Sequence, residues 1–269
     1  MEYANHLNEY DAAPTVEQVA QEVENLKAAA AANNNAEVYK FCFSAIDLTT
    51  LSPCDSEESV AAFARRAAEF ALDYPEIPNV ASICVYPPFV ETVGLEIDAT
   101  PLRITSVAGG FPSSQTFLEV KMLEVAMAVE NGADEVDIVL NVGKMLSGSL
   151  DEAANEVEVL REESDGATLK VILETGALRT PELIRQASLL AMQAGADFIK
   201  TSTGFAGGGA TFADIELFSK HGGEGVRIKA AGGIASLEDA ENFISLGASR
   251  LGTSRIVKLA KAEENISGY

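Results

Sequence analysis

Three lysines occur inside short runs of apolar residues, where a charged side chain is costly to bury. They are Lys170 in LKVILET (169–175), Lys200 in FIKTST (198–203) and Lys229 in RIKAAGG (227–233). Side chains alternate between the two faces of a β-strand, so each lysine occupies one face of its run. If the runs are neighbouring strands and the lysines share a face, the three ammonium groups converge. Such crowding in a partly desolvated site leaves one amine unprotonated near neutral pH, able to form a Schiff base with a carbonyl.

Two carboxylates are candidates for the same site. Asp137 lies in EVDIVLN (135–141) and Asp47 in AIDLTT (45–50), both within or at the end of an apolar run. A carboxylate beside amines can carry the protons that carbinolamine dehydration and enamine formation require, or it can simply pair with the lysines. The alternative for each lysine is an outward position with the ammonium in solvent. Helices over the outer face would bury such charges, which favours the inner face.

The elements that would position these residues alternate along the chain, with short β-branched runs between longer segments of helical spacing. The predicted strands are 41–48, 80–87, 103–109, 135–141, 169–175, 198–203, 227–233 and 249–254. The predicted helices include 56–72, 116–132, 151–164, 180–195 and 236–247. Eight such units in one chain predict an α/β fold, the (β/α)8 TIM barrel, with reactive groups at the C-terminal ends of the strands.

The domain organisation is predicted as one barrel domain covering residues 1–269, without an internal linker. Residues 1–39 form an N-terminal extension, in which Thr15 to Ala32 is an extra helix closing the bottom of the barrel. Residues 40–255 form the barrel core, and 256–269 a C-terminal helix and tail.

Charge and cysteine content limit the partners and the compartment. The net charge of −22 argues against nucleic acid and against anionic membranes as partners. Three cysteines without CxxC spacing indicate neither a disulfide framework nor a zinc site, and the N-terminus lacks a signal-peptide pattern. We therefore expect a cytoplasmic protein without a metal. His6 and His221 are expected on the surface.

Glycines follow the last three predicted strands, in TGFAGGG (203–209), AGG (231–233) and GTS (252–254). Their exposed backbone N–H groups would lie at the C-terminal end of the barrel. Barrels of this kind often bind phosphate near the last strands, so these loops predict an anion site.

The order of these motifs resembles the deoxyribose-phosphate aldolase family of class I, Schiff-base aldolases. The resemblance covers residues 40 to 255 and rests on DLTTL (47–51), SICVYP (82–87), EVDIVLN (135–141), LKVILETG (169–176), FIKTSTGF (198–205) and IKAAGGI (228–234). It implies that Lys200 forms the Schiff base, that Lys229 perturbs it and assists proton transfer, and that Asp137 acts as acid and base. The surrounding polar network implied is Lys170, Asp47, Thr49 and Cys84. The implied phosphate-side residues are Gly204, Gly232, Gly233, Thr253 and Ser254.

The activity implied by the resemblance is that of an aldehyde-lyase. It would cleave 2-deoxy-D-ribose 5-phosphate reversibly into acetaldehyde and D-glyceraldehyde 3-phosphate, without metal or organic cofactor. Its partners would be a small sugar phosphate and aldehydes, and a homodimer is possible. The alternatives are another Schiff-base aldolase, of the transaldolase or ketose-bisphosphate kind, and a catalytically silent barrel that binds a sugar phosphate.

Phe205 departs from the pattern of some relatives, and the C-terminal ISGY is only a weak match to others. Phe205 stands where some relatives have a basic residue, so backbone dipoles would have to meet most of the phosphate charge. The ending ISGY is similar to that of relatives with a mobile C-terminal tyrosine, but the sequence favours a disordered end for Tyr269.

Overall fold

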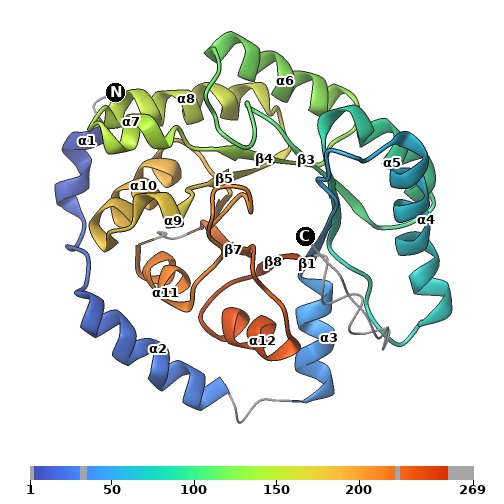
Figure 1. The fold of residues 1–269 in the computed structure, drawn as a ribbon, viewed down its shortest axis with the longest axis horizontal. Helices are drawn as coiled ribbons and strands as arrows, with labels where there is room; N and C mark the ends of the chain where they lie inside the picture. The colour runs from blue at the N-terminus through green and yellow to red at the C-terminus, as the bar shows by residue number, and fades with distance from the viewer. Residues whose placement is uncertain (1–2, 31–34, 222–224, 254–269) are drawn as a thin grey trace.

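The computed structural model describes residues 3–30, 35–221 and 225–253. Eight parallel strands close into a barrel in sequence order, with β8 pairing back to β1 (Figure 1). The strands are β1 Ile46–Thr49, β2 Ser82–Val85, β3 Arg103–Val107, β4 Glu135–Val139, β5 Thr168–Ile172, β6 Phe198–Lys200, β7 Arg227–Ala231 and β8 Arg250–Thr253. The predicted (β/α)8 barrel is confirmed.

Helices surround the barrel. They are α1 Tyr3–His6, α2 Val16–Ala30, α3 Ala36–Ser44, α4 Glu57–Asp73, α5 Val90–Ile97, α6 Leu118–Glu130, α7 Val142–Leu146, α8 Leu150–Glu163, α9 Thr175–Leu178, α10 Pro181–Gln193, α11 Phe212–His221 and α12 Leu237–Ser245, with short 3-10 turns η1 Leu7–Glu9 and η3 Pro87–Phe89. Capping boxes at Ser56 and Ser236 begin α4 and α12. The five helices named from the sequence are confirmed with small differences at their ends.

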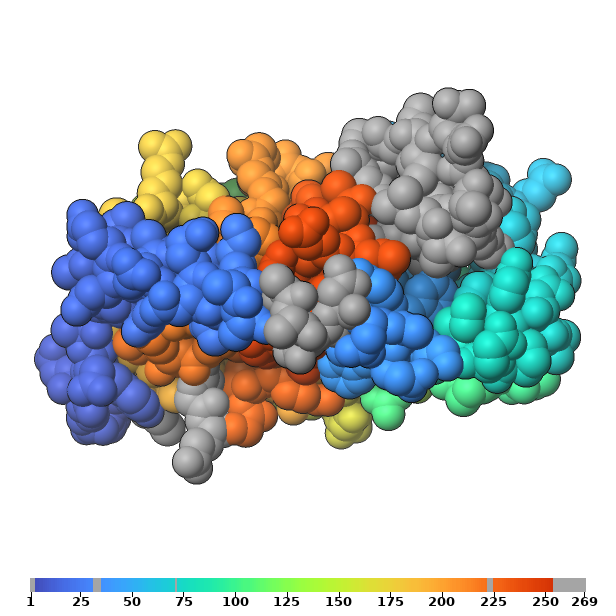
Figure 2. Space-filling view, turned by 90° about the horizontal axis from the view of Figure 1, so that it is seen from below, coloured from blue at the N-terminus to red at the C-terminus, as the bar shows by residue number. Residues whose placement is uncertain are grey.

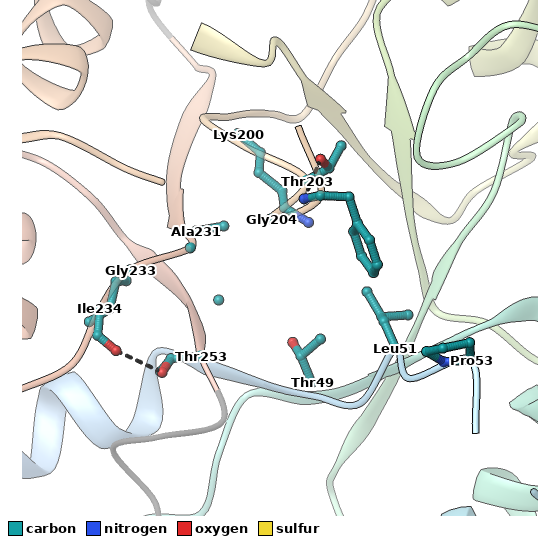
Figure 3. A pocket seen from close by; sticks show the side chains of 13 residues that line it. Thr49, Leu51, Pro53, Lys200, Thr203, Gly204, Ala231, Gly233, Ile234 and Thr253 are labelled. Atoms are coloured by element: carbon teal, nitrogen blue, oxygen red, sulfur yellow. Dashed lines mark hydrogen bonds between the residues drawn. The ribbon is translucent and has the colours of Figure 1, made fainter. Parts of the chain in front are cut away.

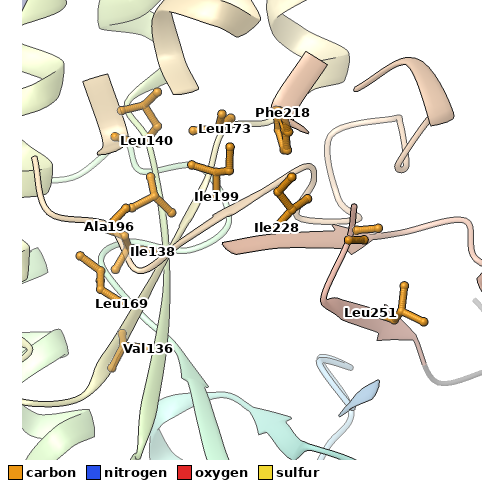
Figure 4. Packing of buried hydrophobic residues seen from close by; sticks show 14 of the residues in the cluster. Val136, Ile138, Leu140, Leu169, Leu173, Ala196, Ile199, Phe218, Ile228 and Leu251 are labelled. Carbon is orange, nitrogen blue, oxygen red and sulfur yellow. The ribbon is translucent and has the colours of Figure 1, made fainter. Parts of the chain in front are cut away.

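The outer faces of the strands hold the barrel in register. Ile138, Leu169, Ile199 and Ile228 alternate with the charged residues of β4 to β7, and they pack with helix residues such as Phe218 of α11 (Figure 4). Burying one such side chain contributes roughly 1.5–3 kcal/mol, and a slip by one residue would turn every side chain to the opposite face. The apolar outer face therefore directs the charged side chains into the lumen.

The predicted strand at 41–48 is partly wrong. Residues up to Ser44 belong to α3, and the strand begins only at Ile46. Asn35 starts this helix by accepting hydrogen bonds from the backbone N–H groups of Glu37 and Val38. A short apolar run such as FCFS fits a strand or a helix equally well, and here the cap decides.

The extra N-terminal helix is present as α2, but its predicted position is wrong. It packs against α11 and α12, outside the ring of helices, and does not close the bottom of the barrel (Figures 1 and 2). Val19 and Val23 form its buried side. An amphipathic helix of this kind shows that one face is covered but not by which element.

The expectation for the histidines is correct for His6, which is exposed, and wrong for His221. His221 is the last residue of α11 and is buried, and α10 packs against this helix. Burial lowers the pKa of this imidazole, and the nearby charge of Arg185 lowers it further.

Within the described residues, none of the helices combines the length and apolar character that a membrane crossing requires. The predicted C-terminal helix at 256–269, Ser254 and Tyr269 lie outside the described residues.

Candidate active site

Asp137 of β4 lies at the centre of the barrel lumen and contacts all three strand lysines. Its Oδ1 is 2.8 Å from Lys170 Nζ, and its Oδ2 is 2.7 Å from Lys200 Nζ and 2.8 Å from Lys229 Nζ. Strand pairing sets Lys170 beside Asp137, and Lys200 beside Lys229. The lysines therefore share the inner face of consecutive strands, as their spacing predicts.

A second layer of contacts surrounds Asp47 and Glu135. Asp47 Oδ2 is 2.5 Å from Lys229 Nζ, and Asp47 Oδ1 is 2.6 Å from Arg250 Nη1. Glu135 Oε2 is 2.6 Å from Lys170 Nζ and 2.9 Å from Arg250 Nη1. All of these side chains are buried. We call the seven residues the lumen cluster: Asp47, Glu135, Asp137, Lys170, Lys200, Lys229 and Arg250.

Glu135 and Arg250 are members that the sequence reasoning missed. Glu135 precedes Asp137 by two residues and so shares its strand face, and Arg250 pairs in register with Lys229. The spacing of Glu135 and Asp137 is visible in the sequence, whereas the register of Arg250 with Lys229 follows from the pairing of β7 with β8.

The two remaining predicted network residues lie beside the cluster. Cys84 is buried. Its burial raises the pKa of the thiol, and the negative charge of Asp137 raises it further. Thr49, at the end of β1, donates a hydrogen bond from its hydroxyl to the backbone carbonyl of Asp47 at 2.9 Å.

The pKa values of the lysines in the lumen cluster are shifted in different directions. Burial lowers the pKa of Lys200, and the charge of Lys229 lowers it further, while Asp137 opposes both. Burial also disfavours the charged forms of Lys170 and Lys229, but their carboxylate partners outweigh it and raise both pKa values. The same cations hold the pKa of Asp137 well below its usual range in spite of its burial. Lys200 is thus the strand lysine that most readily provides a free amine.

Lys200 opens onto a cavity of about 440 Å³ at the C-terminal ends of the strands (Figure 3). The lining residues come mainly from the ends of β1, β6, β7 and β8 and the loops that follow. The predicted phosphate-side residues among them are Gly204, Gly232, Gly233 and Thr253. Ser254 is not among the described residues, so its position is not assigned.

The glycine loops meet at close range on one side of this cavity. Gly232 has φ +82°, and a Cβ there would lie 3.1 Å from Gly209 Cα. A Cβ on Gly209 would lie only 2.6 Å from the Gly232 carbonyl oxygen. Gly204 has φ +88°, and a Cβ there would have no neighbour within 4 Å. A larger residue at 209 or 232 would push apart two loops whose backbone forms the wall of the cavity.

One part of the cavity rim, next to Gly204, is aromatic. Phe205 is 50% exposed and lines the cavity, and its ring meets Phe111 edge-on at 5.6 Å. Phe111 in turn meets Tyr86 at 6.2 Å. Among the described lining residues, Lys200 is the only one with a basic side chain.

Comparison with known proteins finds a matching family and relatives of the same fold. A family model described as DeoC/LacD family aldolase matches residues 41–252. A curated protein from Streptococcus pyogenes serotype M12, named deoxyribose-phosphate aldolase, is 47% identical over 199 residues, which are 71% of this chain and 88% of that protein. The solved tetrameric deoxyribose phosphate aldolase of Aeropyrum pernix superposes with a TM-score of 0.74 at 28% identity, over 93% of this chain and 98% of that chain.

Proposed function

The chain belongs to the DeoC/LacD aldolase family, and on that premise we propose that it cleaves 2-deoxy-D-ribose 5-phosphate reversibly into acetaldehyde and D-glyceraldehyde 3-phosphate. One observation carries the mechanism: Lys200 opens onto the cavity, and its pKa is lowered while those of its two lysine neighbours are raised. An amine in that state attacks an aldehyde carbon, which makes Lys200 the Schiff-base residue.

The reaction begins on the open-chain aldehyde. The Lys200 lone pair adds to C1, the carbonyl oxygen is protonated and leaves as water, and an iminium forms. Loss of the proton from the C3 hydroxyl then breaks the C2–C3 bond, which releases glyceraldehyde 3-phosphate and leaves an enamine on Lys200. Protonation at C2 and hydrolysis release acetaldehyde and restore the amine.

Asp137 and Lys229 are proposed to move these protons. Asp137 Oδ2 lies 2.7 Å from Lys200 Nζ and 2.8 Å from Lys229 Nζ, so one oxygen connects the nucleophile to a protonated amine. The raised pKa of Lys229 keeps it charged as Lys200 changes state. Lys170 and Asp47 hold these groups in place, with Thr49 and Cys84 beside them.

The glycine loops are proposed to bind the phosphate. Gly204, Gly232, Gly233 and Thr253 line one side of the cavity, where backbone N–H dipoles are available to an anion. Phe205 on the aromatic rim offers no charge, which agrees with a phosphate held mainly by the backbone.

Reductive trapping tests this assignment. Incubation with acetaldehyde and borohydride is expected to add an ethyl group to Lys200, located by peptide mapping, while Lys200→Met loses it. The partly exposed Lys40, which forms an ion pair with Glu37, provides the control: Lys40→Met is expected to leave the ethyl adduct on Lys200. An adduct on Lys170 or Lys229 instead would contradict the assignment, and a chain that forms no adduct would be a binding protein.

We also propose that the protein self-associates as a homodimer through the outer face of α6. One stripe of that face is apolar and half or more exposed: Phe117, Val120, Leu123 and Met127. The other exposed residues of α6 are Glu119 and Glu130, near the two ends of the helix, so the apolar stripe between them carries no fully exposed charge despite the net charge of −22. Leu123→Glu is expected to lower the mass measured by light scattering, whereas Leu72→Glu, on the exposed side of α4, is expected to leave it unchanged.

We propose a single barrel domain in the cytoplasm, supported by the closed sheet and by three cysteines without disulfides.

A further inference from the structure

We infer that Arg250 and Glu135 are positioning residues that set the protonation state of Lys200, because they complete a buried set of charges that is neutral only when Lys200 carries no proton. The inference rests on the proposed role of Lys200 as the Schiff-base amine. It concerns two side chains that reach the reacting atoms only through other residues.

The contacts of the lumen cluster show how its charges are matched. Lys170 contacts Glu135 at 2.6 Å, Asp137 at 2.8 Å and Asp47 at 3.6 Å. Arg250 contacts Asp47 at 2.6 Å and Glu135 at 2.9 Å.

Among the described residues, Lys229 contacts two carboxylates, whereas Lys200 contacts one, that of Asp137. Three cations therefore suffice for the three carboxylates, and Lys200 is the basic group with the fewest partners. It is also the member of the lumen cluster that opens onto the cavity.

The remaining groups near Lys200 do not change this balance. The titratable or charged side chains facing it from the surrounding strands are the other members of the lumen cluster and Cys84, whose thiol is buried. Glu174, which follows β5, accepts hydrogen bonds from the backbone N–H and hydroxyl of Thr203. In the described part of the chain Glu174 makes no ion pair with the four bases of the cluster, and Arg103, 3.6 Å from Glu135, is largely exposed to solvent.

A net charge in a buried site is costly, so the cluster resists being left with one. With all four bases protonated it carries one excess positive charge, and losing the Lys200 proton removes that excess. Without Arg250 the same loss would leave an excess negative charge. Without the charge of Glu135 an excess positive charge would persist even after the loss. Arg250 thus favours the free amine, and Glu135 limits how far the pKa falls.

The experiment compares four variants by the acidic limb of the kcat/KM profile, which reports the free enzyme. Arg250→Met is expected to move the limb up by about one pH unit, with an about tenfold loss below it. Glu135→Gln is expected to move it down, and the double variant to bring it back near its original position. Arg250→Lys keeps the charge and loses the forked geometry, so its limb is expected to stay in place.

A purely structural role would lower activity without moving the limb, and without rescue in the double variant. An unmoved limb in Arg250→Met, or an equal shift in Arg250→Lys, would overturn the inference. Circular dichroism would show whether the single variants fold. If they do not, the double variant alone decides: an acidic limb that stays in place supports the inference, and a limb displaced by about one pH unit or more overturns it.

The pH dependence of Lys200 trapping by acetaldehyde and cyanoborohydride provides a second readout. It reports the free amine and does not require turnover of deoxyribose 5-phosphate. If the substrate proposal failed, the trapping profiles of the four variants would still show whether Arg250 and Glu135 set the amine. If trapping never labelled Lys200, the proposed mechanism itself would be rejected.

Discussion

The cavity end of the barrel lumen and the part nearer the N-terminal ends of the strands contain the same kinds of side chain in different numbers. At the cavity, Lys200 has one carboxylate partner, Asp137. Deeper in the lumen, Lys170 has three carboxylates within 4 Å, and Arg250 has two. The pKa of Lys200 is lowered and the pKa values of the deeper bases are raised.

Burial alone does not explain this difference, because burial disfavours the charged form of all these bases. The number of carboxylates within reach decides the direction of the shift. A barrel can therefore hold a reactive amine next to inert ones of the same type, provided that the carboxylates are distributed unequally.

The largest effect is expected from removing the amine at the cavity. Lys200→Leu should lower kcat by ~10³-fold or more, because the raised pKa values of Lys170 and Lys229 disfavour a free amine on either. Steady-state kinetics with deoxyribose 5-phosphate would measure this. A variant with residual activity near wild type would show that a deeper lysine can act and that the two ends of the lumen do not differ.

Asp137→Asn should have the next largest effect, since Asp137 is the carboxylate that both ends share. Turnover is expected to fall by about 10²–10⁴-fold because an amide cannot carry the proton. Affinity for phosphate, measured by calorimetry with inorganic phosphate, should stay nearly unchanged. If the variant had a normal kcat and a raised KM, Asp137 would contribute to substrate binding and not to catalysis.

Lys229→Leu tests how much the neighbouring charge contributes beyond burial. The loss of a positive charge beside Lys200 should raise its pKa, so the acidic limb of kcat/KM should move to higher pH by about one unit. Activity at neutral pH should fall and recover in part as the pH is raised, because the proton carrier is also lost. If the acidic limb stays in place, burial alone lowers the pKa of Lys200, and Lys200 is still the nucleophile.

The smallest effect is expected from chelation. The reaction as proposed uses amines and a carboxylate, and the sequence has no His, Cys or carboxylate spacing typical of a metal site. Dialysis against EDTA should leave kcat unchanged, as measured against an untreated sample. If EDTA abolished activity and a divalent ion restored it, the prediction would be wrong, and a metal ion would have to take part in the reaction.

The strand positions of the site could be predicted because the lysines lie within short apolar runs, in which successive side chains point to opposite faces of the strand. The same alternation that buries Ile199 and Ile228 outward fixes Lys200 and Lys229 inward. What could not be predicted were contacts that depend on closure of the barrel. Arg250 of β8 reaches Asp47 on β1, its neighbour only through closure, and Glu135 of β4 across the lumen, and no local pattern in the sequence indicates these contacts.

The errors in the fold have a similar origin. An apolar stripe identifies α2, Val16–Ala30, as a packed helix, but its partners α11 and α12 begin only at Phe212 and Leu237, far along the chain. His221 is buried for the same reason, since a Gly-rich neighbourhood indicates a loop locally while packing of α10 against α11 covers the residue.

Closure of the barrel depends on its last strand. β8 pairs with β1 as well as β7, and Leu251 donates its backbone N–H to the carbonyl of Ala45 at 2.8 Å. A chain still on the ribosome has no lumen until synthesis has passed Thr253, so β1 and β7 remain open edges and Arg250 is absent from the cluster. The environment that lowers the pKa of Lys200 thus forms only after the whole barrel has been translated. Unfinished chains therefore lack the amine that reacts readily with aldehydes.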